Sequence, residues 1–336
     1  MADFEKRVLL GLSGGVDSAV SARLLQKAGY EVLGLYLDIS ETAAREDAVK
    51  TAEFLDVPLT ILDISAELEE NVKKPFCLSY LRGETPNPCI LCNPSVKFKS
   101  LREKADELGC RYIATGHYAR AKDGGIYRAL SKNDQSYMLC RLKRNQAENL
   151  ILPLGEFPKT HVRELAEEFG IPVAKKPDSM EICFIPDKDY AGFIGKRFPL
   201  PPPGKLLLGG EVVGEHKGIH TLTVGQRIPG LFNERKAYVD RIDPESNDVI
   251  LALWDDLFKK EVRAADFSWL IDEPSEPFEA NVKVRHTKWE MPLCRVTPLG
   301  EGNVIIETDD PFRAPARGQT AAVYVGDRLV GGGRII

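Results

Sequence analysis

Apolar and polar positions along the first half of the chain alternate between strand-like and helix-like spacing. The apolar runs VLLGLS, EVLGLYLD, VPLTILDI and RYIATG have the length of buried strands. Between them, residues 19–28, 42–55 and 94–108 repeat apolar side chains at helical spacing. This alternation predicts a parallel α/β sheet with helices on both faces. Ligands of such sheets bind beyond the carboxyl ends of the strands.

The pattern changes in the second half. Residues 158–174 still predict a helix, which Gly170 ends, and then a short extended piece. The segment RFPLPPPGKLLLGG that follows contains four prolines and three glycines, which is typical of a linker. Beyond it, short β-rich runs are separated by turn sequences such as PESND and GEG. We predict an α/β domain over 1–196, a small β-rich domain over 205–257 and a β-barrel over 258–336.

Composition narrows the class of protein. Hydrophobic residues make up 43% of the 336 residues and charged residues 28%, which is ordinary for a soluble protein. The apolar runs are far shorter than the roughly 20 residues that a membrane span needs. The charged residues at positions 3–7 leave no room for the apolar segment of a signal peptide. We therefore expect a cytoplasmic protein that contacts no membrane and whose cysteines are mostly thiols.

The net charge bears on nucleic-acid partners. A formal charge of −5 argues against a protein that coats nucleic acid. An RNA substrate needs only a local basic surface, and KFKSLREK and the pair KK at 175–176 are candidates. The alternative is that these lysines form a solvated helix face.

The segment LSGGVDS, residues 12–18, follows the first strand and starts a helix. It lacks the Lys-Ser/Thr pair of a Walker loop and the spaced glycines of a dinucleotide fingerprint. Adjacent glycines permit positive φ and close approach, and backbone N–H groups at a helix N-terminus favour an anion. Ser13 and Ser18 add hydroxyl donors, whereas we expect Asp17 to bridge a metal or fix the loop. A tight turn with an acid near the helix start is the alternative.

Three of the seven cysteines stand in unusual settings. Cys89 and Cys92 have C-x-x-C spacing in a proline-bound loop before a helix, whose N-terminus would lower their pKa. A buried apolar pair is the alternative, and zinc would need a second ligand pair that the chain does not offer. Cys183 lies in KKPDSMEICFIP. The remaining four have ordinary surroundings and are expected only to pack: Cys77, Cys110, Cys140 and Cys294.

SGGVDS resembles the pyrophosphate-binding loop of the PP-loop ATPases, which cleave ATP to AMP and pyrophosphate. Other segments, in order along almost the whole chain, resemble the tRNA-specific 2-thiouridylase family (MnmA/TrmU). They are TPNPCILCN, ATGHYAR, NDQSYML, KKPDSMEICFIP, GIHTLTVGQR and RAPARGQTAAVYVGDRLVGGGRI. The resemblance implies an N-terminal PP-loop domain of the adenine nucleotide alpha hydrolase type, a small β-rich central domain and a tRNA-contacting C-terminal β-barrel.

The resemblance also implies an activity. The family makes 2-thiouridine at the wobble position of Lys, Glu and Gln tRNAs. ATP, with Mg²⁺, adenylates the uridine 2-carbonyl oxygen, and sulfur displaces AMP. The implied partners are a tRNA substrate and a sulfur-donating protein or sulfide source, and no oligomer is required. The alternatives are a PP-loop ATP pyrophosphatase with a small-molecule acceptor, and a non-enzymatic tRNA-binding or metal-carrying module.

Site residues follow from the resemblance, position by position. The ATP phosphates would lie on Gly11, Leu12, Ser13, Gly14, Gly15, Val16, Asp17 and Ser18, and the adenosine against Leu37 and Gly116. Cys92 matches the nucleophile and Cys183 the persulfide carrier. The target base would meet Asn87, Pro88 and Cys89, and the rest of the tRNA Asn133, Asp134, Gln135, Arg285 and His286. His117, in ATGHY, has the alternative of a loop histidine that is hydrogen-bonded to the backbone.

One departure affects the mechanism. This chain has Cys89 where well-known members of the family have the aspartate of TPNPD, which has been viewed as a general acid/base. The set of Cys89, Cys92 and Cys183 resembles the site of related iron–sulfur tRNA thiolases, where three cysteines hold a [4Fe–4S] cluster with one open iron. Two mechanisms are therefore open: a Cys183 persulfide with a transient Cys92–Cys183 disulfide, or sulfide on a cluster held by all three thiols.

Overall fold

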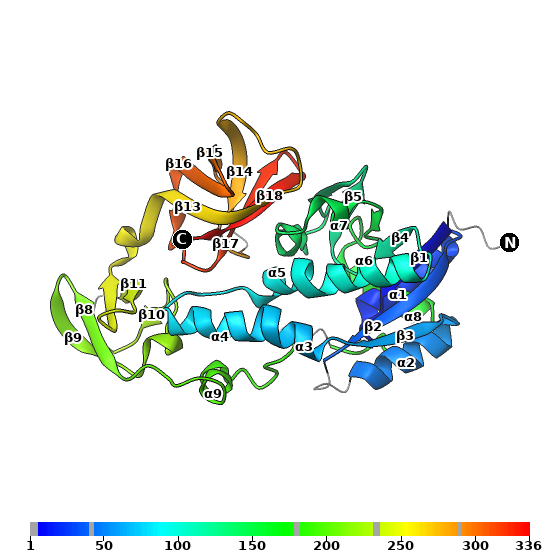
Figure 1. The fold of residues 1–336 in the computed structure, drawn as a ribbon, viewed down its shortest axis with the longest axis horizontal. Helices are drawn as coiled ribbons and strands as arrows, with labels where there is room; N and C mark the ends of the chain where they lie inside the picture. The colour runs from blue at the N-terminus through cyan, green and yellow to red at the C-terminus, as the bar shows by residue number, and fades with distance from the viewer. Residues whose placement is uncertain (1–5, 40–43, 178–181, 231–235, 288–289) are drawn as a thin grey trace.

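The computed structural model describes residues 6–39, 44–177, 182–230, 236–287 and 290–336 (Figure 1). It contains a parallel five-stranded sheet, a second sheet of five strands and an eight-stranded sheet that includes a closed barrel. The fold class expected from the sequence is therefore confirmed. Within the described residues, no helix is both long and apolar enough to cross a membrane.

The parallel sheet has the strand order β3-β2-β1-β4-β7, with β1 at its centre. Its strands are β1 (Arg7–Gly11), β2 (Glu31–Asp38), β3 (Leu59–Asp63), β4 (Tyr112–Ala114) and β7 (Leu150–Ile151). Val8 and Leu10 pack into one buried cluster and Leu9 into another, because successive side chains of a strand point to opposite faces. Continuous apolar runs are what a sheet covered on both faces requires.

Helices cover the two faces. The core cluster on one face takes residues from α1 (Val16–Lys27), α2 (Ala44–Leu55) and α8 (Lys159–Glu168), and that on the other from α5 (Pro88–Cys92) and α6 (Phe98–Glu107). The further helical segments are α3 (Ser65–Leu68), η2 (Glu69–Lys73), α4 (Lys74–Leu81), η3 (Asn93–Lys97), η4 (Ser136–Leu139), α7 (Arg144–Ala147) and α9 (Tyr190–Gly195). The single helix expected over 94–108 is thus α6, with the π-helical η3 and the short α5 before it.

The second half of the chain forms two β structures. The central sheet has the order β10-β11-β12-β8-β9, and the barrel has the order β13-β16-β15-β14-β17-β18, closed by pairing of β13 with β18. The central elements are β8 (Gly204–Leu208), β9 (Glu211–His216), η5 (Ile219–Thr221), β10 (Arg227–Ile228), β11 (Ala237–Asp243), β12 (Asp248–Ala252) and η6 (Trp254–Leu257). The barrel strands are β13 (Phe258–Trp269), β14 (Phe278–Lys283), β15 (Leu293–Gly300), β16 (Asn303–Arg313), β17 (Thr320–Val325) and β18 (Arg328–Ile335).

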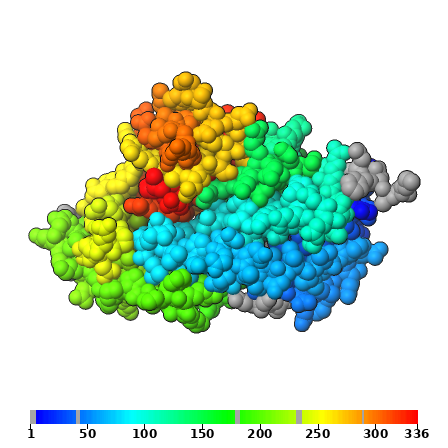
Figure 2. Space-filling model, viewed as in Figure 1, coloured from blue at the N-terminus to red at the C-terminus, as the bar shows by residue number. Residues whose placement is uncertain are grey.

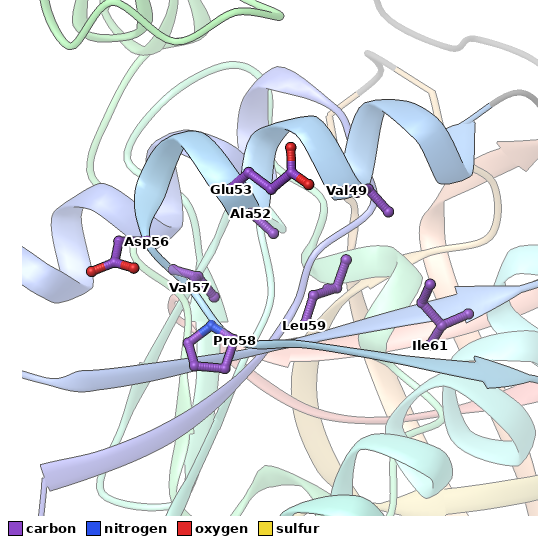
Figure 3. Close-up of a pocket in the computed structure, with 8 residues that line it drawn as sticks. All are labelled: Val49, Ala52, Glu53, Asp56, Val57, Pro58, Leu59 and Ile61. Atoms are coloured by element: carbon purple, nitrogen blue, oxygen red, sulfur yellow. The ribbon is translucent and has the colours of Figure 1, made fainter.

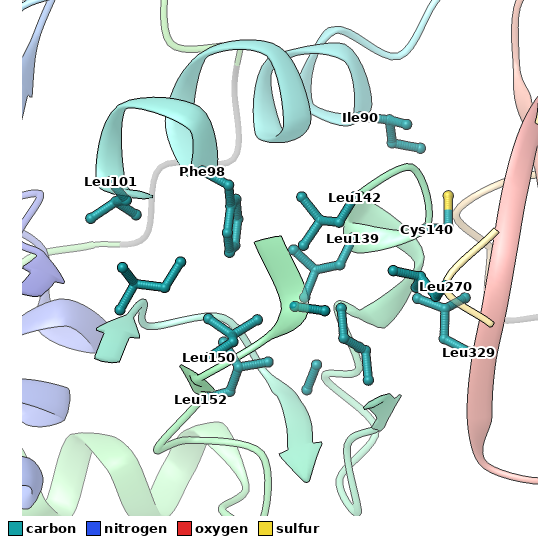
Figure 4. Close-up of a cluster of buried hydrophobic side chains, with 14 of the residues drawn as sticks. Ile90, Phe98, Leu101, Leu139, Cys140, Leu142, Leu150, Leu152, Leu270 and Leu329 are labelled. Carbon is teal, nitrogen blue, oxygen red and sulfur yellow. The ribbon is translucent and has the colours of Figure 1, made fainter. Parts of the chain in front are cut away.

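The first domain and the barrel share structure. The hairpin of β5 (Ala119–Lys122) and β6 (Gly125–Arg128) extends the barrel sheet, because β6 pairs with β18. They also share a hydrophobic cluster (Figure 4), in which Phe98 and Leu101 of the first domain belong with Leu270 and Leu329 of the barrel. The two parts therefore do not pack as independent bodies.

Candidate functional site: a nucleotide loop and three thiols

The loop after β1 is organised around its own serines. Ser18 Oγ donates to the Gly15 carbonyl at 3.0 Å and accepts from the Ser13 N–H at 3.2 Å. Gly14 has a φ of +72°, and α1 begins immediately after Gly15 with no side-chain cap. The N-terminal N–H groups of α1 therefore point to the loop without a capping side chain, which is the arrangement that binds anions.

Two glycines of the site are needed for close approach. A Cβ on Gly14 would lie 2.7 Å from the Ala44 carbonyl oxygen and 2.7 Å from the Ala48 nitrogen. A Cβ on Gly116 would lie 3.0 Å from both the Asp17 carbonyl carbon and the Ser18 nitrogen. The loop is thus enclosed by the start of α2 and by the segment after β4, so a larger side chain at either glycine would displace it.

Asp17 is held by two side chains from other elements. Tyr118 Oη donates to its carboxylate at 2.7 Å, and Lys159 Nζ lies 2.7 Å from both carboxylate oxygens. This arrangement agrees with the loop-fixing role rather than with metal bridging. Because both oxygens already accept from Lys159, we derive no step through a metal ion on Asp17. Lys159 was not identified from the sequence, since it is the first residue of α8 and lies in no quoted motif.

The three thiols lie in one neighbourhood. Cys89 and Cys183 are exposed, whereas Cys92 is partly buried at the end of α5. Burial, and then the charge of Cys92 and Cys89, raises the pKa of Cys183 to about 11. Although the residue is exposed overall, its thiol is therefore only poorly solvated. Burial also raises the pKa of Cys92, an effect to which Cys89 adds and which Lys97 opposes.

The expected lowering of the thiol pKa is therefore wrong for Cys92. The sequence places it near a helix N-terminus, but α5 begins at Pro88 and Cys92 is its last residue. Its side chain packs against the apolar cluster of Phe76, Val96 and Phe184. Loss of water around the sulfur outweighs the positive charge of Lys97, so the resting thiol is protonated near neutral pH.

Cys183 is held close to Cys92 by its neighbours in the chain. Phe184 and Ile185 are 4% and 1% exposed and belong to the same apolar cluster that Cys92 packs against. The preceding part of the motif, residues 178–181, lies outside the described residues. Cys183, which we expect to carry sulfur, is thus anchored by the two buried residues that follow it.

The fit of an iron–sulfur cluster can be tested on the thiols. Among the described residues, no group of three or more His, Cys, Asp or Glu side chains is arranged to hold a metal ion. The three thiols influence one another's ionisation but do not form a ligand set as they stand, so we derive no step through a cluster. The packing role expected of the other four cysteines is confirmed, since all are buried: Cys77, Cys110, Cys140 and Cys294.

The residues expected to meet the base have structural partners. Asn87 is the N-cap of α5 and accepts a hydrogen bond from the Ile90 N–H at 3.4 Å, while Pro88 is buried.

His117 has a side chain as its hydrogen-bond partner. Its Nδ1 lies 2.7 Å from the Thr115 hydroxyl, whereas the alternative interpretation expected a bond to the backbone. Burial, with Lys97 adding to it, lowers the pKa of His117 to about 3, so the ring is neutral at pH 7.

In the turn expected to contact tRNA, residues 133–135, two of the three side chains accept hydrogen bonds from the backbone. Asp134 accepts from the Ala129 and Ser136 N–H groups, and Gln135 accepts from the Tyr118 N–H. Asn133, in contrast, is exposed. The Asn133 side chain is therefore accessible to a ligand, while the hydrogen bonds of Asp134 and Gln135 hold the turn in shape.

Arg285 and His286 follow β14 of the barrel. The Arg285 guanidinium donates to the Val224 carbonyl in the central domain at 2.6 Å, and burial lowers its pKa. His286 is exposed, and its ring lies 5.9 Å from that of Tyr137. Arg285 thus connects two domains, whereas His286 is accessible to a ligand.

A surface pocket of about 360 Å³ lies elsewhere, between α2 and the edge strand β3 (Figure 3). Val49 and Glu53 of α2 and Leu59 and Ile61 of β3 are among its lining residues. None of the residues that line it belongs to the nucleotide loop or carries one of the three thiols. The site is therefore defined by the loop and the thiols and not by this pocket.

Family models match nearly the whole chain. Residues 6–187 match the tRNA methyl transferase HUP domain, residues 195–253 the tRNA methyl transferase PRC-barrel domain and residues 259–335 the aminomethyltransferase beta-barrel domain. Among solved structures, a 4-thiouridine synthetase–RNA complex with bound ATP covers 55% of this chain and 46% of its own, at 20% identity and a TM-score of 0.38.

Curated relatives match over their full length. The tRNA-specific 2-thiouridylase MnmA 2 of Clostridium botulinum (strain Loch Maree / Type A3) is 39% identical over an alignment of 345 positions, which includes 98% of each chain. MnmA 1 of Caldanaerobacter subterraneus subsp. tengcongensis is 40% identical over 99% of this chain and 98% of its own. The chain therefore belongs to the tRNA-specific 2-thiouridylase family of enzymes.

Proposed function

We propose that the protein catalyses the ATP-dependent 2-thiolation of the wobble uridine in Lys, Glu and Gln tRNAs. One connection in the structure carries this proposal. Gly116 abuts Asp17 of the nucleotide loop, and the ring of the adjacent His117 lies 5.9 Å from that of Phe98, the residue after Lys97. The charge of Lys97 acts to lower the pKa of His117 and also that of Cys92 and Cys183. This proximity supports a single site in which nucleotide and sulfur chemistry meet.

In the first step, the loop Gly11–Ser18 binds the ATP phosphates, and Leu37 and Gly116 line the adenosine. The uridine 2-carbonyl oxygen attacks the α-phosphorus, so an O–P bond forms, the α–β phosphoanhydride bond breaks and pyrophosphate leaves. Backbone N–H groups at the start of α1 stabilise the charge that moves onto pyrophosphate. Mg²⁺ would come with the ATP phosphates and would add to this stabilisation.

In the second step, a persulfide on Cys183 supplies sulfur. Its terminal sulfur attacks C2 of the adenylated uridine, and AMP leaves with the bonding electron pair. The Cys92 thiolate then attacks the Cys183 sulfur, so the thiolated base is released and a Cys92–Cys183 disulfide forms. An external thiol reduces this disulfide, and a sulfur-donating protein or another persulfide source reloads Cys183. Because burial raises the pKa of both thiols, Cys92 must lose its proton before it attacks, and Cys183 must lose its proton when it is reloaded.

The tRNA would lie across the first domain and the barrel. Asn133 and His286 are exposed and come from elements that meet at the domain contact. Cys89 is exposed at the first turn of α5, where the flipped uridine would arrive. The proposal sets the reaction in the cytoplasm, where thiols stay reduced.

The decisive experiment is thiolation of unmodified tRNA. Purified protein is incubated with Glu tRNA, Mg-ATP, a persulfide donor and thiol reductant, and the digested nucleosides are separated by mass. We expect 2-thiouridine at the wobble position, with one AMP released for each sulfur incorporated. A non-enzymatic module, or a ligase whose small-molecule acceptor is absent, would release no AMP and leave the tRNA unmodified. AMP release that does not require tRNA would show that the acceptor is another molecule. Either result would refute the proposal.

A further inference from the structure

We infer that the turn over residues 314–319 of the C-terminal barrel positions the loop that carries Cys89 and Cys92. This inference rests on the proposed function, to which it adds a positioning element from another domain. It starts from two hydrogen bonds between the backbone of Thr85 and residues that are far from it in the sequence. The Thr85 N–H donates to the Arg317 carbonyl at 2.8 Å, and Gln319 Nε2 donates to the Thr85 carbonyl at 2.7 Å.

The contact is tight as well as hydrogen-bonded. Gly318 has a φ of +85°, and a Cβ there would lie 2.9 Å from Glu84 Cβ and 3.0 Å from the Thr85 nitrogen. Glu84 itself is 7% exposed and is paired with Arg82 at 3.3 Å and with Arg334 of β18 at 3.7 Å. In Figure 2 the red C-terminal residues lie directly against blue and cyan residues of the first domain.

The turn is itself rigid. Gly318 N–H donates to the Ile335 carbonyl, and Ile335 N–H donates to the Gln319 carbonyl. Ala314 and Ala316 are buried in the core cluster of the central domain. The same junction receives the end of α4, because a Cβ on Gly83 would lie only 2.4 Å from Ile242 Cγ2 of β11. All three domains therefore meet at residues 83–85.

The connection from this junction to the thiols is short and stiff. Thr85 is followed by Pro86, Asn87 and Pro88, and both prolines are buried. Proline fixes φ near −65°, and Asn87 caps α5, so a shift of Thr85 is transmitted to α5 and its two thiols. The resemblance to the 2-thiouridylase family implies that the C-terminal barrel contacts tRNA. Its docking on Thr85 therefore couples the seating of tRNA to the position of Cys92.

The test compares two glycines of the barrel that both have positive φ. Gly318→Ala adds a methyl group against Thr85, whereas Gly326→Ala adds one where nothing lies within 4 Å. Gly326 has a φ of +59°, so both variants carry backbone strain but only the first touches the thiol loop. Gln319→Leu removes the bond to the Thr85 carbonyl without steric pressure and serves if Gly318→Ala fails to fold.

Two readouts are measured on each full-length variant. The first is the rate at which iodoacetamide alkylates Cys89 and Cys92 in the absence of substrates, followed by peptide mass. The second is the ratio of 2-thiouridine formed to AMP released with tRNA. We expect Gly318→Ala and Gln319→Leu to change the alkylation rates and to lower thiolation about ten- to a hundredfold while AMP release persists. Gly326→Ala should stay within about twofold of the wild type in both.

Unchanged alkylation and thiolation in a folded Gly318→Ala protein would overturn the inference, as would equal losses in Gly326→Ala. Alkylation of the resting protein needs neither ATP nor tRNA. A wild-type protein that makes no 2-thiouridine would refute the proposed function, while the alkylation comparison would still decide whether the turn positions the thiols.

Discussion

Lys159 Nζ lies 2.7 Å from both carboxylate oxygens of Asp17, which joins the start of α8 to the nucleotide loop across 142 positions of the sequence. Both side chains are largely shielded, with 17% and 30% of their surface exposed. The pair therefore holds the first turn of α1 in place and keeps a positive charge beside the expected phosphate site.

Removing this charge should impair adenylation. We expect Lys159→Met to lower the rate of ATP- and tRNA-dependent AMP release about 10²- to 10³-fold, because Asp17 would be left beside the phosphates without its counter-charge. Asp17→Ala should have a similar effect, and the double variant should lose little more than either single variant. Lys205→Met, at an exposed position of β8 in the central domain, is the matched control. Additive losses would show that the two residues act separately.

Gly14 should tolerate no side chain. Gly14→Ala places a methyl group 2.7 Å from backbone atoms of α2, so we expect AMP release to fall about 100-fold or more as the loop is displaced. Gly124→Ala is the control, since Gly124 has a φ of +70° but nothing lies within 4 Å of its Cβ position. AMP release is measured with labelled ATP. Equal rates in the two variants would remove loop geometry from the mechanism.

The cysteines should separate the two sulfur routes. With a Cys183 persulfide, Cys92→Ser and Cys183→Ser should abolish thiolation while AMP release continues, because adenylation uses other residues. Cys89→Ser should keep most of the thiolation, and intact-protein mass should show an added sulfur on Cys183. If all three serine variants lose thiolation together with a broad absorbance near 400 nm in anaerobic protein, the cluster route holds instead (the wavelength is about where such clusters absorb).

Arg285 should matter first for stability. Its guanidinium donates to the Val224 carbonyl at a domain contact, so Arg285→Met should lower the free energy of unfolding by about 1.5–3 kcal/mol. We expect the slope of log tRNA affinity against log salt to stay unchanged, because this donor is already engaged. A slope smaller in magnitude by about 0.7–0.9 would instead identify Arg285 as a phosphate contact. Denaturant titration and filter binding provide the two measurements.

His117 should make stability depend on pH. Its folded-state pKa of about 3 lies below the ordinary histidine value of 6.5. Between pH 3 and 6.5 the folded protein therefore binds fewer protons than the unfolded chain. The stability contributed by the neutral ring is present above about pH 6.5 and is lost as pH falls toward 3, with a slope of up to about 1.4 kcal/mol per pH unit. His117→Gln should flatten this part of the profile relative to wild type in denaturant titrations. An identical profile in the variant would show that His117 is not responsible.

The sequence predicted a parallel sheet and most elements of the first domain, but the order of the strands came from the structure. The continuous apolar runs around Leu9 and Leu35 favoured strands covered on both faces, because they are strand-sized and alternate with helical patterns. The run SGGVDS likewise indicated an anion loop, because adjacent glycines permit the positive φ that Gly14 adopts and a close approach to the backbone. The three unusual cysteines were also evident, since their spacing and motifs need no tertiary information.

Tertiary structure alone decided what surrounds those residues. The pairing of Lys159 with Asp17 and of Gln319 with Thr85 joins segments far apart along the chain, and no local pattern records such contacts. The same holds for β6, which lies in the first domain but pairs with β18 of the barrel. The pKa of Cys92 was misjudged for a related reason: spacing indicates a nearby helix end, but the ionisation of a thiol depends on how much water the packed protein leaves around the sulfur.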